Sequence, residues 1–150
     1  FAGFAAAFTA VSGTRAGVNA AKYALALEDT ELDEREVERL KGILWEPMNR
    51  VGGFTPRWAI QVIQDAYLPY WISLYKNEAR LNAALTNIEF IRDNIVPKLK
   101  VYNNHDLRLA HEVRNIILHI EMKLRAALMR KESRWYHYRE DYPLRDDENW

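Results

Sequence analysis

Hydrophobic residues recur at intervals of three and four along most of this chain, which is the spacing of side chains on one face of an α-helix. The longest stripe predicts a helix over roughly 106–132, and another begins near Leu81 and is loosened at its end by Pro97. The stripes consist of Leu81, Leu85, Ile88, Ile91, Ile95 and Leu99, and of Leu109, Val113, Ile116, Ile120, Leu124 and Ala127. No segment alternates as a strand would, so the pattern predicts an all-α fold.

Helix-start and helix-stop residues divide the remaining stripes. Thr30 is suited to cap a helix that ends at Pro47 and has a buried stripe of Leu32, Val37, Leu40 and Leu44. Thr55 followed by proline starts the next helix, which Pro69 should kink or split. In the turn VYNNHD, either Asn104 or Asp106 is available to cap the longest helix.

The N-terminal part differs in composition from the rest of the chain. Residues 5–27 are rich in Ala and predict a helix of small residues, weakened by Gly13 and Gly17. Residues 1–27 contain no acidic residue, whereas 28–38 contain seven, which suggests a junction near residue 28. We therefore expect three parts: a small-residue helix over 1–27, an antiparallel, spectrin-like bundle of about three long helices over 28–132, and an irregular aromatic and charged tail over 133–150.

Composition narrows the function classes. The chain has 150 residues, of which 49% are hydrophobic and 28% charged, as in an ordinary soluble domain. Its formal net charge is zero, which gives no indication of a nucleic acid or anionic membrane partner. It has no cysteine, so disulfides and cysteine-ligated metals are excluded. The opening FAGFAAAF is too short to span a bilayer, and we read it as a cut within a larger, cytoplasmic protein.

No group of residues forms a complete active site. The histidines are His105, His111, His119 and His137, and none has the spacing of a helical zinc site or belongs to a Glu-x-x-His pair. Nucleophile elbows, phosphate loops and dinucleotide fingerprints are also missing from the sequence. We therefore assign no catalytic residue and no metal ligand.

The segment AYLPYWISLY presents Tyr67, Tyr70, Trp71 and Tyr75 on one predicted helix face. Rings at helical spacing usually belong to a core, so we favour that interpretation. A ligand pocket is the alternative, and tyrosine and tryptophan also suit a protein interface.

The final segment, RKESRWYHYREDYPLRDDENW, resembles the signature that closes the C-terminal helical domain of the fumarate reductase/succinate dehydrogenase flavoprotein family. The pattern runs approximately R-x-E-S-R-G-x-H-x-R-x-D-x-P-x-R-D-D-x-x-W. Matching positions are Arg130, Glu132, Ser133, Arg134, His137, Arg139, Asp141, Pro143, Arg145, Asp146, Asp147 and Trp150. From these we take nine as motif or interface candidates: Arg130, Glu132, Ser133, Arg134, His137, Arg139, Asp141, Arg145 and Trp150.

Other segments agree with this resemblance. ELDEREVERLKGILWE is similar to the helix that opens the family's domain, and KLKVYNN to the turn before its last long helix. SGTRAGVNAAKYA is similar to the helix that finishes the FAD-binding domain, so 1–27 would be the truncated trailing helix of that domain. Trp135 replaces the motif's glycine, and the middle of the chain is long and aromatic; both features resemble the adenylylsulfate reductase alpha-subunit branch.

The resemblance implies that the parent protein binds FAD and exchanges electrons with an iron–sulfur partner subunit. The nucleotide-binding and substrate-binding residues would precede Phe1, so we expect no cofactor in this fragment. Any membrane association would come through partner subunits rather than direct insertion. The alternative is a free-standing helical interaction module without catalytic activity.

Two roles remain open for the tail. It can lie across the parent's flavin domain or a partner subunit, with Arg134 and Arg139 forming forked bonds to carboxylates there. It can instead pack back onto its own bundle.

Overall fold

The computed structural model describes residues 3–28 and 31–150, which divide into two compact units, Phe1–Leu40 and Lys41–Trp150. The first unit contains the predicted small-residue helix, α1 (Phe4–Ala26), and none of its side chains is buried. Helix α2 (Glu34–Asn49) begins there and runs into the second unit. The proposed cap Thr30 lies outside the described residues, and the Asp33 carboxylate accepts a 2.9 Å hydrogen bond from the Arg35 amide at the start of α2.

The prediction that Pro47 ends this helix is wrong. Pro47 lies inside α2 and is buried, and the helix continues to Asn49. Bonds from a distant segment hold this last turn: the Val101 amide donates to the Pro47 carbonyl (3.1 Å), and Lys100 Nζ donates to the Met48 carbonyl (2.6 Å). The stripe predicted to be buried is also mostly exposed, because periodicity identifies an apolar face without showing what covers it.

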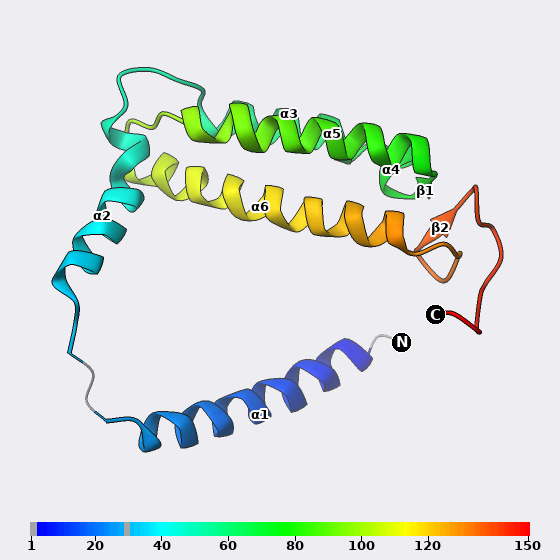
Figure 1. Cartoon of the computed structure of the whole chain (residues 1–150), viewed down its shortest axis with the longest axis horizontal. Helices are drawn as coiled ribbons and strands as arrows, with labels where there is room; N and C mark the ends of the chain where they lie inside the picture. The colour runs from blue at the N-terminus through cyan, green and yellow to red at the C-terminus, as the bar shows by residue number, and fades with distance from the viewer. Residues whose placement is uncertain (1–2, 29–30) are drawn as a thin grey trace. The chain divides into compact units, whose positions relative to one another are not determined.

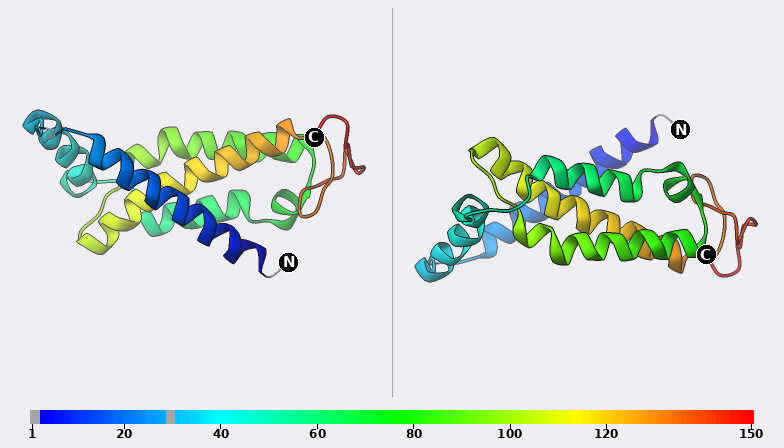
Figure 2. Two further views of the ribbon diagram at one scale, coloured as in Figure 1. Left: turned by 90° about the horizontal axis from the view of Figure 1, so that it is seen from below. Right: turned by 90° about the horizontal axis from the view of Figure 1, so that it is seen from above.

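Three helices form the core of the second unit: α3 (Pro56–Tyr67), α5 (Glu78–Asn94) and α6 (Asn104–Met129). They run antiparallel to their chain neighbours, as the two views of Figure 2 show. Their buried side chains form one hydrophobic core. This confirms the predicted all-α bundle. The core is formed mainly by Ala59, Ile63, Leu81, Ala84, Leu85, Ile88, Ile91, Leu99, Leu107, Ala110, Val113, Ile117, Ile120 and Leu124.

Local capping sets the starts of these helices. The Thr55 hydroxyl accepts from the Trp58 amide before α3, as predicted, and Asn77 accepts from the Arg80 amide before α5. For α6 the cap is Asn103, whose side chain accepts a 2.9 Å bond from the Asp106 amide, rather than Asn104 or Asp106 itself. The end of α5 loosens into the 3₁₀ turn η1 (Val96–Lys98), which contains Pro97, as predicted.

Pro69 splits the third predicted helix, with consequences for the rings around it. After α3, Pro69 precedes a single turn, α4 (Tyr70–Ser73), and a two-residue strand, β1 (Tyr75–Lys76). Strand β1 pairs in parallel with β2 (Tyr138–Arg139) in the tail, at the end of the bundle where α6 stops (Figure 1).

The rings of this region do not form the core that we favoured. Tyr70, Trp71 and Tyr75 are exposed, and only Tyr67 packs against the buried cluster. Within residues 3–28 and 31–150, no helix combines the length and hydropathy needed to cross a bilayer.

We expect Leu124→Ala to lower the free energy of unfolding by about 2–5 kcal/mol, because it removes a fully buried side chain and leaves a cavity. Leu118→Ala, on the same helix but exposed, is the matched control and should change it by less than about 0.5 kcal/mol. Urea denaturation followed by circular dichroism measures both. Equal effects of the two substitutions would contradict the assignment of the α6 core face.

Candidate functional site

Arg139 is the centre of the tail and is fully buried. Its guanidinium Nη1 donates to three carbonyls at the C-terminal end of α6, those of Ala127 (2.5 Å), Arg130 (3.3 Å) and Leu128 (3.4 Å). These carbonyls have no partner within the helix, and the cation lies at the negative end of the helix dipole. Arg139 therefore closes α6 from a position ten residues beyond its last residue, Met129.

Asp141 extends this contact to a second helix. Arg139 holds its carboxylate in a fork, with Nε–Oδ1 at 2.8 Å and Nη2–Oδ2 at 2.7 Å. The same carboxylate accepts a 2.8 Å bond from the Glu78 amide at the N-terminus of α5. The bond from Arg139, with a smaller contribution from the Glu78 amide, lowers the pKa of Asp141 to about 2 despite the opposing effect of burial.

Glu132 is the second fully buried charged residue. Its carboxylate accepts bonds from Arg134 (Nε, 3.0 Å), from Arg130 (Nε, 2.8 Å) and from the Asp146 amide (2.9 Å). The hydrogen bond from Arg134 is the main reason why the pKa of Glu132 falls to about 2, and the other two donors reinforce it against desolvation. The tail is thus held to itself and to the bundle end by two buried charged groups.

The remaining motif residues complete this clasp, by which we mean residues 130–147 folded over the ends of α5 and α6. The Ser133 hydroxyl accepts from the Arg139 amide (2.8 Å) and contacts the Tyr142 carbonyl (2.8 Å). Arg134 also bonds Asp147 (2.7 Å), and Arg145 bonds the same carboxylate (2.6 Å). The Trp150 carbonyl accepts a longer bond from Arg134 (3.4 Å).

These contacts show which groups of the chain the charged residues of the tail bind. The carboxylates bound by Arg134 and Arg139 belong to this chain, and their partners are Glu132, Asp147 and Asp141. In this structure these two arginines bind carboxylates of their own chain, and a docking role for the tail stays a prediction.

The rings of the tail behave differently. Trp135 and Tyr136 are 83% and 91% exposed, at the tip of a turn closed by paired hydrogen bonds between Arg134 and His137. Trp135 has a φ of +55°, in the left-handed region that favours glycine, the residue that the motif has at this position. Edge-to-face contacts join Tyr138 to Tyr75 and Tyr75 to Tyr70 on the surface nearby.

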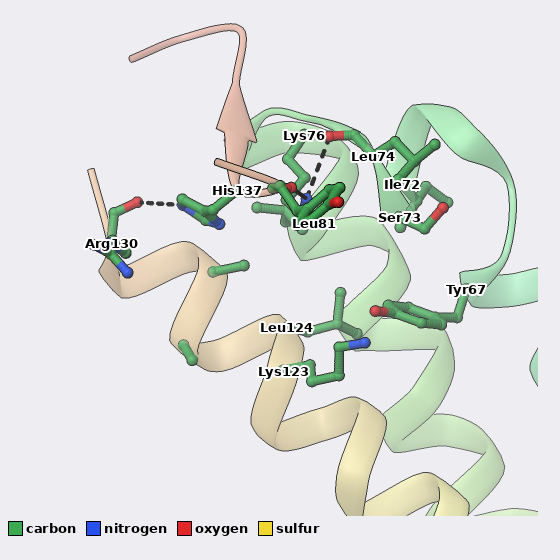
Figure 3. A pocket seen from close by; sticks show the side chains of 13 residues that line it. Tyr67, Ile72, Ser73, Leu74, Lys76, Leu81, Lys123, Leu124, Arg130 and His137 are labelled. Atoms are coloured by element: carbon green, nitrogen blue, oxygen red, sulfur yellow. Dashed lines mark hydrogen bonds between the residues drawn. The ribbon is translucent and has the colours of Figure 1, made fainter. Parts of the chain in front are cut away.

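A pocket of about 560 Å³ opens between α4, β1, α6 and the tail (Figure 3). His137 and Arg130 from the motif line it, and the His137 ring nitrogen Nε2 lies 3.2 Å from the Arg130 carbonyl. Burial, together with the nearby charges of Lys76, Arg130 and Arg139, lowers the pKa of His137. Lys76, Lys123 and Tyr67 also line the pocket, and no signal in the sequence would have joined the two lysines.

The other histidines do not gather into a metal site. His111 contacts the Leu44 carbonyl through Nε2 at 2.9 Å. In the described part of the chain, no three side chains of His, Cys, Asp or Glu are grouped so as to hold a metal ion.

The fold and the motif clasp together define a C-terminal helical domain of a flavoprotein subunit. The family described as fumarate reductase flavoprotein C-term matches residues 67–150, and the chain belongs to this family.

Individual relatives and structures give the same result. The chain is 31% identical over 150 residues to a fumarate reductase (CoM/CoB) subunit from Methanothermobacter marburgensis, with 94% of this chain and 26% of the relative covered. An uncharacterized FAD-dependent oxidoreductase of Methanocaldococcus jannaschii is 32% identical over 148 residues, covering 97% and 26%. The Mycobacterium smegmatis Sdh1 complex in the apo form contains a chain with a TM-score of 0.79 and 29% identity, covering 91% and 24%. The chain thus spans about a quarter of the length of these relatives.

We expect Trp135→Gly to stabilise the turn by about 1 kcal/mol, because glycine adopts a positive φ without the steric cost that tryptophan bears. The His137 amide, which donates to the Arg134 carbonyl, reports the turn directly through its hydrogen-exchange rate. Tyr136→Gly is the control, since Tyr136 is similarly exposed but has an ordinary φ, and it should speed exchange. Faster exchange in Trp135→Gly would contradict the strain at this position.

Acid should release the clasp. Glu132 and Asp141 have folded pKa values of about 2, below their ordinary values of 4.5 and 3.8. Such groups stabilise the fold above the ordinary value, and this contribution is lost as the pH falls from about 5 towards 2. Hydrogen exchange at the Ser133 and Arg139 amides, which bond within the clasp, should rise relative to the exchange of an unstructured peptide across that range. Unchanged protection between about pH 5 and pH 2.5 would contradict the depressed pKa values.

Proposed function

We propose that this chain is the C-terminal domain of an FAD-dependent oxidoreductase, in which it supports the flavin domain and contributes a docking surface. The observation that carries this proposal is the family match over residues 67–150, together with relatives named as flavoprotein subunits or FAD-dependent oxidoreductases. In this proposal residues 1–27 are the trailing helix of the flavin domain. Helix α1 has no buried side chain, and apolar residues such as Phe4 and Phe8 suit a helix that packs within the proposed flavin domain.

The docking surface that we propose is the ring surface, defined as Tyr70, Trp71, Tyr75, Trp135, Tyr136 and Tyr138. All six side chains are exposed in this chain. Tyrosine and tryptophan are among the residues most enriched in protein interfaces, so a partner surface is a suitable cover for these rings. Trp135 is the strongest case, because its ring is solvated and its backbone conformation is one that tryptophan rarely adopts. Neither the folding of the bundle nor the geometry of the turn requires a tryptophan at this position. Contact of the ring with another protein surface would explain it.

FAD and electron transfer belong to the parent protein in this proposal. The chain contains no dinucleotide fingerprint, so the flavin would be held by the part of the parent that precedes it. An iron–sulfur subunit is the proposed electron partner, and a cytoplasmic location with membrane association through partner subunits is the proposed setting. The kinship with adenylylsulfate reductase stays a prediction, supported by Trp135 and the aromatic middle segment.

A free-standing interaction module remains the second candidate, and the same ring surface favours it. The two candidates differ in what the surface meets: the flavin domain or a partner of the parent protein in one, and an unrelated protein in the other.

We expect Trp135→Ala in the full-length flavoprotein to weaken FAD retention or binding of the partner by roughly thirtyfold, the loss typical of a central interface tryptophan. Retention is measured by flavin absorbance after gel filtration, and association by the dissociation constant for the partner. Tyr102→Ala is the control, since Tyr102 is exposed at the opposite end of the bundle, beside the start of α6.

If Trp135→Ala matched the wild type in both measurements, the ring surface would not be a docking surface. Hydroxyl-radical footprinting gives a second readout, because the Trp135 ring should be oxidised more slowly in the full-length protein than in the isolated chain.

A further inference from the structure

The charged side chains that line the pocket next to the ring surface are all positive. The only charged residues among its lining are Lys76, Lys123 and Arg130, and no carboxylate lines it among the described residues. Lys76 Nζ donates to the carbonyls of Leu74 (3.3 Å) and Tyr136 (3.4 Å), which holds the amine at the pocket's edge (Figure 3). Lys123 Nζ lies over the Tyr67 ring, 5.2 Å from its centre, across the pocket on α6.

The two lysines differ from the arginines around them. Arg130 is paired with Glu132, and Arg139, just behind the pocket, is paired with Asp141. Within the part of the chain that the structure describes, neither Lys76 nor Lys123 forms an ion pair. The positive charge of the pocket is therefore uncompensated at these two amines, on opposite sides of the same opening.

The electrostatic effects within the pocket agree with this. Burial is the main cause that lowers the pKa of Lys76, and the charges of Lys123 and Arg139 lower it further. The pKa of His137 is lowered by burial and by Lys76, Arg130 and Arg139, although its contact with the Arg130 carbonyl opposes this. An anion between the lysines would offset the positive charges that repel the protonated forms of Lys76 and His137.

The walls of the pocket are mainly apolar and restrict the kind of anion. They are formed by Ile72, Leu74, Leu81, Leu124, Ala126 and Ala127, together with Tyr67. Placing a doubly charged, strongly hydrated group against such walls costs more desolvation than placing a single charge. An apolar body attached to the anion would gain from covering the parts of Ile72 and Leu74 that water reaches.

We propose that this pocket binds a single carboxylate on an apolar body, with the carboxylate between Lys76 and Lys123 and the body against the exposed Leu74 and the half-buried Ile72. The carboxylate has two possible sources, a free organic acid or an acidic side chain flanked by apolar residues elsewhere in the parent protein. The second source rests on the proposed function, and the first does not.

The test uses octanoate as the probe, titrated into the chain and followed by chemical shifts of the Leu124 and His137 side chains. We expect saturable binding, with octanol and octylammonium binding at least about fivefold more weakly because they lack the negative charge. Lys123→Met, which keeps the aliphatic stem, should weaken octanoate binding by about fivefold, and Lys76→Met should do the same. Lys98→Met, at the other end of the bundle, is the matched control and should have no effect.

Three results would overturn the proposal: no saturable shift with octanoate, equal affinity for octanol, or equal affinity in Lys123→Met and Lys98→Met. The source is then identified in the full-length protein. Octanoate binding there with the same affinity indicates a free organic acid. Its exclusion there, with binding retained by the isolated chain, indicates a built-in acidic side chain. A proposed function that proved wrong would leave the isolated-chain titration unaffected, so the two failures are distinguishable.

Discussion

The end of the bundle depends on the buried guanidinium of Arg139. One side of it satisfies carbonyls at the end of α6, and its other edge holds Asp141, which in turn accepts the first amide of α5. A cation thus meets the negative end of one helix and a carboxylate meets the positive end of its neighbour. A buried ion pair by itself is weak evidence of stability, since desolvation offsets much of the attraction. Here the helix ends supply further hydrogen bonds, so that both charges are compensated on several sides.

This arrangement explains why the charged residues of the tail bind one another while the rings at positions 135 and 136 stay exposed. The arginines and carboxylates are occupied by one another over a short length of chain, which holds the backbone of the clasp in place. The Tyr142 ring joins them, with the Arg139 guanidinium 5.0 Å from its centre. The rings at positions 135 and 136 are left at the tip of a turn, where they stay largely solvated. A rigid turn that presents two exposed rings loses little conformational entropy when they are covered, which favours a contact surface.

The sequence predicted those features that depend on neighbours along the chain. The α5 stripe is buried throughout, and α1, the Pro69 break and the Thr55 cap all follow from local spacing. For α6 the prediction was right at Val113, Ile120, Leu124 and Ala127, which are buried. It was one residue early at Leu109 and Ile116, which are half-buried next to the buried Ala110 and Ile117. The prediction that Pro47 ends its helix was wrong, because a hydrogen bond from Val101 holds the last turn of α2. The prediction that the rings at 70, 71 and 75 are buried was also wrong, because this segment forms only the single turn α4. Both features are tertiary.

The candidate site shows the same division more sharply. The motif identified Arg130, Glu132, Arg134, Arg139 and Asp141 as a set, but no spacing rule shows that they bind one another. Lys76 lines the pocket from β1, which pairs with β2 more than sixty residues further along the chain. Arg139, the second residue of β2, is also held at the end of α6. The clasp therefore has a second consequence beyond closing the helices. It brings together an apolar wall and two lysines that form no ion pair within residues 3–28 and 31–150, from three separate parts of the sequence.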